Sequence, residues 1–535
     1  MEQSVDRFED ISDERREFIH WLTENGAIFP KIKLIKDGTF STEIINENEM
    51  FATIPFSIII NEKIAHKTLP FLKSLSSTCH RSSLIIFLIH EKLLERNSFY
   101  FPYINILPKH VNSLLYYDEN EINSWLKGTD IENFVIEKRS QLKKDYEEIL
   151  KALPSDGILS EKISWELYLW GYYIVTSRSF PNKLIDPEDA ESTEALIPLA
   201  DSLNHRPRQK ITWQFSDREY MRLVAGETIE CGKEIYNNYG PKSNKELLLG
   251  YGFCIKDNPD DWITIKLNFD QDPDREEKLE ILKNLELSEL THYIKKDYIP
   301  NKLLSQCRIL VLNYFETMYF RQYYQEKEKD LTYQEGEISG NKRTDLFKFV
   351  GYRNEISMLE IFAMLLNRKL NAVIVNEEET KNINQDTEMS IYVKIFRDGQ
   401  KEILKSAIEK IQSLELKVLS RALSDFKENK ISKSPFLFNK NNTTDELNKE
   451  NSFSESNKDY LEIKETLLDS LLITVDKAMK MDQKFSEAIH NIFNILDDEL
   501  EDTILILYLI HESNNKESYW KNFIEAVKDF KFTLM

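Results

Sequence analysis

Hydrophobic residues in the first half of the chain follow two different periodicities. Short apolar and β-branched runs between Gly, Pro and Asn turns, such as Met50–Ile60 and Ile211–Phe215, are typical of β-strands. Between about residues 63 and 180 apolar residues recur every three or four positions, as in Ser82–Leu94, which predicts helices. Trp165–Thr176 is apolar on every side, so we expect it to lie in a core. The first half is therefore predicted to combine strands with helices.

After about residue 275 the pattern changes to long amphipathic helices. In Gln400–Lys427 one apolar stripe with helical spacing comprises Ile403, Leu404, Ala407, Ile408, Ile411, Leu414 and Val418. We interpret this stripe as the core of a helix bundle rather than as a coiled-coil surface. Two polar segments, about 326–343 and 433–459, are predicted to be flexible loops. The predicted fold class is α+β, with an all-α C-terminal half.

The composition fits a soluble protein of several domains. The chain has 535 residues, of which 41% are hydrophobic and 30% charged. No stretch approaches the roughly 18 apolar residues of a membrane span, and residues 1–20 resemble no targeting segment. The cysteines are scattered and form no CxxC pair: Cys79, Cys231, Cys254 and Cys307. We expect a cytoplasmic protein, with the nucleus as a second expected location, and neither a metal site nor disulfides.

The charge balance narrows the choice of partner. The chain carries 70 Lys and Arg against 91 Asp and Glu, a formal net charge of −21. An excess of acidic residues disfavours nucleic acid and favours a basic protein as partner.

Polar and aromatic residues gather near sharp turns in Ile197–Phe253. Asn204–His205 precede a turn that contains Pro207, and Tyr239 is followed by a glycine turn. Ser243 begins a helix, with Glu246 in the capping-box position. A buried polar group without a partner costs about 1–3 kcal/mol, so such groups need either structural partners or a ligand.

The order of these pieces resembles the SET-domain protein-lysine methyltransferases of the Rubisco large-subunit methyltransferase type, and looks most like the fungal ribosomal protein lysine methyltransferases. Four motifs carry the resemblance: D-x-x-N-H at Asp201–His205, G-E-x-I at Gly226–Ile229, Y-G-x-x-S-N at Tyr239–Asn244 and Y-G-F at Tyr251–Phe253. Weaker similarities lie upstream: Phe18–Gly26, Ile54–Pro55, Phe101–Pro108 and Ser177–Phe180. The resemblance implies a SET domain at 1–265, with a helical insert at about 63–180, and a helical substrate-binding domain at 266–535.

The resemblance also implies an activity. The protein would transfer methyl groups from S-adenosyl-L-methionine to a lysine ε-amine of a non-histone protein, preferably a basic ribosomal protein, and would act as a monomer without a membrane or nucleic-acid partner. Alternatives are a cytochrome c lysine methyltransferase and a SET pseudoenzyme that serves as a binding scaffold. A histidine methyltransferase of the actin-modifying kind is disfavoured, because the Tyr239–Asn244 turn followed by Tyr251 looks more like the lysine enzymes.

Site residues follow from the same resemblance. Tyr239 would be the catalytic tyrosine; the alternative is a structural tyrosine whose hydroxyl is bonded to a backbone carbonyl. Asp201 and Tyr251 would line the substrate-lysine channel. The cofactor would contact eight residues: Gly38, Thr39, Phe40, Arg178, Asn204, His205, Tyr239 and Phe253. The family's G-x-G loop corresponds to Lys36–Asp37–Gly38, where the first glycine is replaced, a departure that supports the scaffold alternative.

Overall fold

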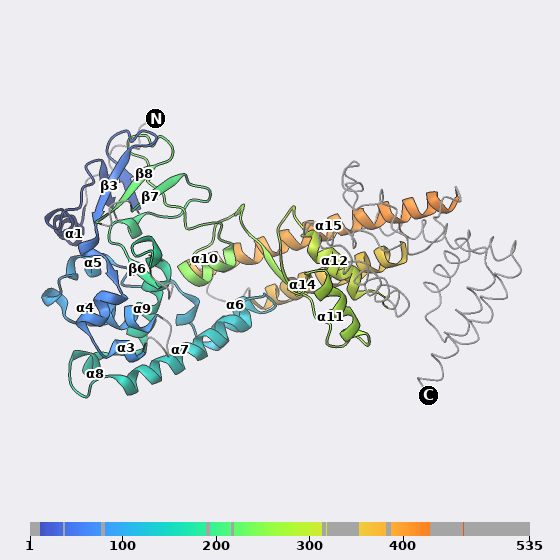
Figure 1. Cartoon of the computed structure of the whole chain (residues 1–535), viewed down its shortest axis with the longest axis horizontal. Coiled ribbons are helices and arrows are strands. Elements are labelled where there is room, and N and C mark those ends of the chain that lie inside the picture. Colours follow the sequence, from blue (N-terminus) through green and yellow to red (C-terminus); the bar gives the residue numbers. More distant parts are fainter. Residues whose placement is uncertain are drawn as a thin grey trace, which may run out of the picture. The chain divides into compact units, whose positions relative to one another are not determined.

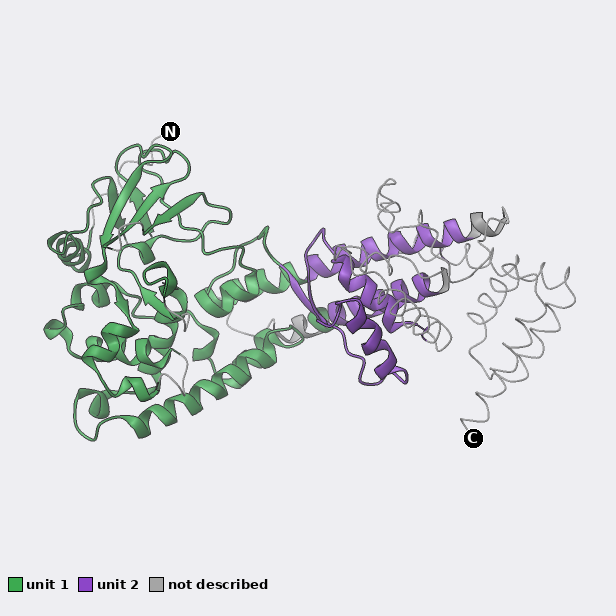
Figure 2. Ribbon diagram, viewed as in Figure 1, with its two compact units in different colours: residues 1–261, 372–400 green, residues 262–371, 401–535 purple. Residues whose placement is uncertain are grey.

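The chain divides into two compact units. The computed structural model describes residues 11–35, 38–75, 81–188, 193–215, 219–312, 317, 352–380, 387–427 and 464. Unit 1 comprises Met1–Asp261 and Ala372–Gln400, and unit 2 comprises Trp262–Asn371 and Lys401–Met535 (Figure 2). The loops predicted at 326–343 and 433–459 lie outside the described residues. Within the described ranges, the model contains no helix with the length and hydropathy of a membrane span.

The strands of unit 1 form three small antiparallel sheets (Figure 1). Their members are β1 (Ile32–Ile35) with β2 (Gly38–Ser41); β3 (Met50–Pro55), β8 (Tyr220–Ala225) and β7 (Ile211–Gln214) in that order; and β4 (Ile60–Asn61), β6 (Glu194–Leu196) and β5 (Ser179–Pro181) in that order. Both runs predicted as strands are extended, although Met50–Ile60 is interrupted after Pro55 by a 3₁₀ turn at Phe56–Ile58.

The segment from 63 to 180 is helical, as the periodicity predicts. Unit 1 contains α1 (Asp13–Glu24), α2 (Glu62–Thr68), α3 (Leu72–Leu75), α4 (Ser82–Leu93), α5 (Phe101–Ile106), α6 (Glu119–Leu126), α7 (Glu132–Ala152), α8 (Ile158–Lys162), α9 (Trp165–Arg178) and α10 (Asn244–Tyr251). Helix α9 packs against α4 so closely that a Cβ on Gly171 would lie 3.0 Å from Ile85 Cγ2. Six of the fourteen residues of α9 are buried, so its middle lies in the core as expected, and its last residue is Arg178. This core helix therefore carries Arg178, one of the predicted site residues.

The described residues of unit 2 form helices and one pair of antiparallel strands. Unit 2 contains β9 (Ile263–Lys266) paired with β10 (Thr291–Ile294), α11 (Arg275–Asn284), α12 (Asn301–Leu310), most of α14 (Tyr352–Thr380) and most of α15 (Glu388–Lys427). The seven apolar residues of the predicted stripe in α15 are all buried in the core of this unit. This strand pair differs from the all-α expectation, because Ile263 and Ile265 alternate with more exposed residues and turn one face of β9 toward the core.

Residues 372–400 belong to unit 1, whereas the sequence placed them in the C-terminal domain. Met389, Val393 and Phe396 are buried in the unit 1 core. The Arg397 guanidinium donates through Nη1 to the carbonyl of Trp125 at 3.1 Å and through Nη2 to that of Val373 at 2.5 Å. These contacts are nonlocal, so sequence periodicity could not reveal them.

Helix α10 is fixed at both ends. Ser243 and Glu246 form the predicted capping box at its start. At its end Gly252 has a left-handed φ of +76°, and its carbonyl accepts a hydrogen bond from Asn112 Nδ2 at 2.9 Å. A Cβ on Gly252 would lie 1.7 Å from the Asn112 carbonyl oxygen, so only glycine fits between Tyr251 and Phe253.

Gly252→Ala is therefore expected to lower the free energy of unfolding by about 2 kcal/mol or more, because a backbone clash adds to the cost of a left-handed alanine. The matched control is Gly250→Ala. Gly250 lies inside α10, and its nearest neighbour would be Thr176 Cγ2 at 3.9 Å. We expect that control to leave the unfolding free energy unchanged or to raise it by up to about 1 kcal/mol. Denaturant unfolding of both variants measures the difference, and equal effects would contradict this interpretation.

Candidate active site

Two segments that are far apart in the sequence run parallel at His205 and Asn237. The Asn237 amide donates to the Asn204 carbonyl at 2.7 Å, and the Arg206 amide donates to the Asn237 carbonyl at 3.0 Å. A third bond runs from the Tyr239 amide to His205 Nδ1 at 3.1 Å. This pairing brings the N-H motif beside the predicted catalytic tyrosine.

The Tyr239 ring lies between two other rings. His205 stacks on it with centroids 4.9 Å apart, and Tyr251 stacks on it at 4.8 Å. The Tyr239 hydroxyl donates to the Leu203 carbonyl at 2.9 Å, and burial raises the pKa of this phenol above its ordinary value. The backbone-bonded hydroxyl of the structural alternative is thus present. Because the proton is directed at Leu203, the phenol oxygen keeps lone pairs that can accept a contact.

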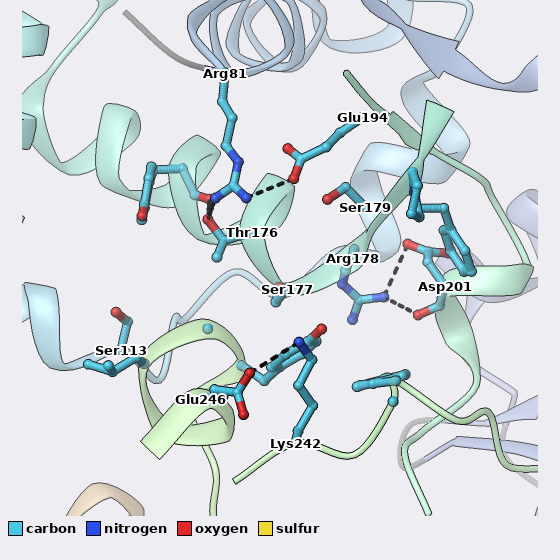
Figure 3. A pocket seen from close by; sticks show the side chains of 18 of the residues that line it. Arg81, Ser113, Thr176, Ser177, Arg178, Ser179, Glu194, Asp201, Lys242 and Glu246 are labelled. Atoms are coloured by element: carbon cyan, nitrogen blue, oxygen red, sulfur yellow. Dashed lines mark hydrogen bonds and ion pairs between the residues drawn. The ribbon is translucent and has the colours of Figure 1, made fainter. Parts of the chain in front are cut away.

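The buried Asp201 and the partly buried Arg178 form an ion pair beside this stack (Figure 3). Arg178 Nη1 donates to the Asp201 carbonyl at 2.9 Å and to its carboxylate Oδ2 at 3.3 Å. Tyr103 donates its hydroxyl to the same Oδ2 at 2.8 Å. Burial raises the pKa of Asp201, against the opposing effects of Arg178 and the Tyr103 hydroxyl, and the net shift is upward. Burial lowers the pKa of Arg178, but Asp201, Tyr103 and Tyr239 together raise it more, so the net shift is upward.

These groups line one cavity of about 770 Å³. Arg178, Asp201, Tyr239 and Tyr251 all contribute to its wall. Additional rings come from Phe134, Tyr172, Phe180 and Trp213. A cavity with a charged pair and aromatic walls is suited to a long side chain with a cationic end.

The other predicted residues lie outside the lining of this cavity. Thr39 of β2 bonds through Oγ1 to the Ser202 carbonyl at 3.1 Å, and a Cβ on Gly38 would lie 3.0 Å from Asn204 Nδ2. Phe40 bridges to Glu234 in an antiparallel backbone pair. The β2 strand thus lies next to the segment that carries Asn204. Lys36 and Asp37 lie outside the described residues.

Asn204, His205 and Phe253 complete the predicted set. Asn204 is exposed, and its amide donates to Glu234 Oε1 at 2.7 Å. Phe253 packs edge-on against Tyr251 at 6.3 Å and against Tyr392 of α15 at 6.5 Å. Gly38, Thr39, Phe40, Asn204, His205 and Phe253 do not line the 770 Å³ cavity, so the predicted residues divide into two groups that meet at Tyr239.

Comparison with known proteins identifies the fold. No family model matches the chain. The solved structure of the Rubisco large-subunit methyltransferase bound to sinefungin and monomethyllysine superposes with a TM-score of 0.61 and 19% identity, over 84% of this chain and 99% of that one. A second structure, described as the SET domain of this methyltransferase bound to lysine and S-adenosylhomocysteine, has a TM-score of 0.61 and 20% identity over 78% of this chain. The chain has a SET-domain fold.

Similar sequences agree with this fold. The ribosomal lysine N-methyltransferase set10 of Schizosaccharomyces pombe is 31% identical over 381 residues, which cover 69% of this chain and 65% of that protein. The ribosomal lysine N-methyltransferase 1 of Saccharomyces cerevisiae is 26% identical, over 60% of each. The chain thus spans less than two thirds of the length of both. The human actin-histidine N-methyltransferase is 25% identical over 426 residues. The resemblance inferred from the four motifs is confirmed.

Sequence reasoning missed three parts of the SET-domain site. Tyr103 lies in the Phe101–Pro108 segment, which the sequence indicates only as a weak similarity to the family, and its bond to Asp201 spans 98 residues. Trp213 packs edge-on against Phe180, with ring centroids 5.2 Å apart. The alternation of apolar and polar residues along β7 is the one sequence signal that its side chain faces inward. Arg81 bonds Glu194 at 2.7 Å in the cavity wall, and no local signal marks that pair (Figure 3). Within the described residues, no group of three or more His, Cys, Asp or Glu side chains could hold a metal ion.

The protonation state of His205 makes the stability of the folded chain depend on pH. Burial lowers its pKa below the ordinary value of 6.5, and Nδ1 must be unprotonated to accept the Tyr239 amide. The unfolded chain therefore binds a proton more readily, and the stability from His205 is present above about pH 6.5 and lost as the pH falls through the folded pKa.

We expect wild-type protein to lose stability relative to His205→Asn as the pH falls from about 8 to 5.5, because asparagine offers an acceptor that does not titrate. Unfolding measured at several pH values tests this. A difference that stays constant with pH, or an NMR-measured pKa of His205 above 6.5, would contradict it.

Proposed function

We propose that this chain is an S-adenosyl-L-methionine-dependent protein-lysine N-methyltransferase, and that its substrate is a basic ribosomal protein. The observation that carries the proposal is the position of Tyr239. Its ring stacks on His205 on one side and on Tyr251 on the other, and it lines the cavity that contains Asp201 and Arg178. One phenol thus separates a group of residues suited to the cofactor from a cavity suited to a lysine.

The residues beside the cavity fit S-adenosyl-L-methionine by their chemistry. The ligand has an amino-acid end, a ribose and an adenine. Asn204 offers an exposed amide, and β2 offers backbone at Gly38, where a Cβ would lie 2.6 Å from Glu234 Oε1 and 3.0 Å from Asn204 Nδ2. Phe253 offers a ring for a flat base. These residues, with Thr39, Phe40 and His205, would hold the cofactor, which when bound supplies an electrophilic methyl group on a positive sulfonium.

Arg178 would contact the carboxylate of the cofactor. Both hydrogen bonds from Arg178 to Asp201 start at Nη1, and 24% of the Arg178 side chain is exposed. A guanidinium has five N–H donors, so the Arg178 guanidinium keeps donors for a second carboxylate. Arg178 would then join the two halves of the site.

The cavity would prepare the lysine. A free lysine titrates near 10.4 and must be neutral to attack. The Asp201 carboxylate and the Tyr251 ring attract the ammonium as it enters. Desolvation between the rings then favours the neutral amine, and alignment beside the Tyr239 oxygen supplies most of the remaining rate, since proximity can contribute on the order of 7–11 kcal/mol.

The substrate class rests on the fungal relatives and on charge. Both fungal proteins are named for ribosomal lysine methylation. A net charge of −21 favours encounter with a basic target such as a ribosomal protein. The actin-histidine relatives support histidine methylation as a second candidate. The buried Asp201 carboxylate favours lysine, because an ammonium gains more from a negative charge than a neutral imidazole does.

The first test compares intact masses of ribosomal proteins from cells with and without this gene. We expect one basic protein to lose the mass of one or more methyl groups without the gene. Wild-type chain should restore the mass, and Tyr239→Phe, which removes only the hydroxyl, should not. Unchanged masses throughout would contradict the proposed substrate, and full restoration by Tyr239→Phe would contradict the role of the phenol.

The second test is Asp201→Asn, assayed on matched peptides that carry lysine or histidine at the target position. We expect kcat/KM for the lysine peptide to fall at least about tenfold, which corresponds to 1.4 kcal/mol of transition-state stabilisation. The loss follows because Arg178 is left without its counter-charge beside an entering cation. A wild-type enzyme that prefers the histidine peptide would favour the second candidate.

A further inference from the structure

Tyr103 contacts the candidate site without lining its cavity. The residue lies in α5 and is 0% exposed, and its hydroxyl donates to Asp201 Oδ2 at 2.8 Å. The same oxygen accepts Arg178 Nη1 at 3.3 Å. The residues that form the 770 Å³ cavity include Asp201 and Arg178 but not Tyr103. Any effect of Tyr103 on a bound side chain must therefore act through Asp201.

The surrounding core holds this hydroxyl in place. The Tyr103 ring packs against Phe18 of α1 with centroids 6.1 Å apart, and α1 packs along α5. Pro102 lies at the first turn of α5, where its fixed φ favours the start of a helix. Because packing restricts the Tyr103 side chain, its hydroxyl points in one direction. Forming the hydrogen bond to Asp201 therefore costs little additional side-chain entropy.

The charge state of Asp201 depends on the groups around it. Arg178 of α9, Tyr103 of α5 and the phenol of Tyr239 face its carboxylate. Burial opposes ionisation of Asp201, while the guanidinium and the Tyr103 hydroxyl favour it. A hydroxyl that donates to a carboxylate also fixes the rotation of the carboxylate, so it orients Asp201 as well as stabilising its charge.

We propose that Tyr103 is a positioning residue, which keeps Asp201 ionised and oriented toward Arg178 so that the cavity accepts a cationic side chain. This inference rests on the proposed lysine methyltransferase function for its catalytic consequence. Its structural part, the coupling between Tyr103 and Asp201, stands without that function and is tested separately.

The first experiment needs no activity. Tyr103→Phe removes only the hydroxyl, and unfolding midpoints are measured from about pH 4.5 to 8 in wild-type and Asp201→Asn backgrounds. Loss of the hydroxyl raises the folded pKa of Asp201 further above its unfolded value near 3.9, so the variant loses more stability above the folded pKa than below it. We expect the midpoint shift caused by Tyr103→Phe to grow with pH in the wild-type background and to be independent of pH in the Asp201→Asn background.

The control is Tyr100→Phe. Tyr100 is a buried neighbour whose ring contacts are Trp21, Phe87 and Phe99. The shift in unfolding midpoint caused by Tyr100→Phe should be the same in both backgrounds and at every pH. If Tyr103→Phe behaves like this control, or keeps its pH dependence in the Asp201→Asn background, the proposal is wrong. If Tyr103→Phe folds only in the Asp201→Asn background, the loss in the wild-type background comes from the carboxylate left without its donor and supports the proposal; failure to fold in both backgrounds is a packing effect and contradicts it.

The second experiment measures methylation of a lysine peptide. We expect Tyr103→Phe to lower kcat/KM about tenfold through a higher KM for the peptide, with the affinity for S-adenosylhomocysteine unchanged. The ratio of variant to wild-type kcat/KM should be lowest at the most acidic pH and should lose its pH dependence in the Asp201→Asn background. A loss equal at every pH would overturn the positioning role. A wild-type protein without methyltransferase activity would instead overturn the proposed function, and the unfolding experiment would still decide the coupling.

Discussion

The parallel pairing of residues 204–206 with 237–239 is the constraint on which the candidate site depends. Its backbone bonds at 2.7 and 3.0 Å join segments more than thirty residues apart and place Tyr239 against His205. Asp201 precedes one segment of this pairing, and Tyr251, the last residue of α10, follows the other. The rings, the ion pair and the exposed amide of Asn204 therefore converge because two short segments exchange hydrogen bonds. A break in that pairing would separate the residues proposed to bind the lysine from those proposed to bind the cofactor.

Local signals predicted much of the fold and part of the site. The helical periodicity of 63–180, the buried Trp165–Thr176 helix and the Ser243–Glu246 capping box depend on residues close in sequence, and all three are present in the structure. The D-x-x-N-H and Y-G-x-x-S-N motifs were assigned to one site by resemblance, and the structure brings His205 and Tyr239 together. The three local features could be predicted because each depends on spacing along the chain, whereas the shared site came from the resemblance to a known family.

Contacts between distant residues could not be predicted from spacing. The Tyr103 hydroxyl reaches Asp201 across 98 positions, and the Arg81–Glu194 pair spans 113. Arg397 joins residues 372–400 to unit 1 by donating to backbone carbonyls, which carry no side-chain signature. Strands β9 and β10 have only four residues each, too few for alternation to stand out among helices, and α11 separates them in the sequence. The tertiary fold decides each of these features.

The central claim is that a methyl donor and a lysine meet at Tyr239. A structure of the chain determined with S-adenosylhomocysteine and a lysine-containing peptide tests it most directly. The account predicts the thioether on the Asn204 and His205 side of the Tyr239 ring, and the lysine amine in the cavity with Asp201 and Tyr251, close to the phenol oxygen. Either ligand bound away from Tyr239, or a Tyr239 oxygen that faces solvent in the complex, would contradict the account.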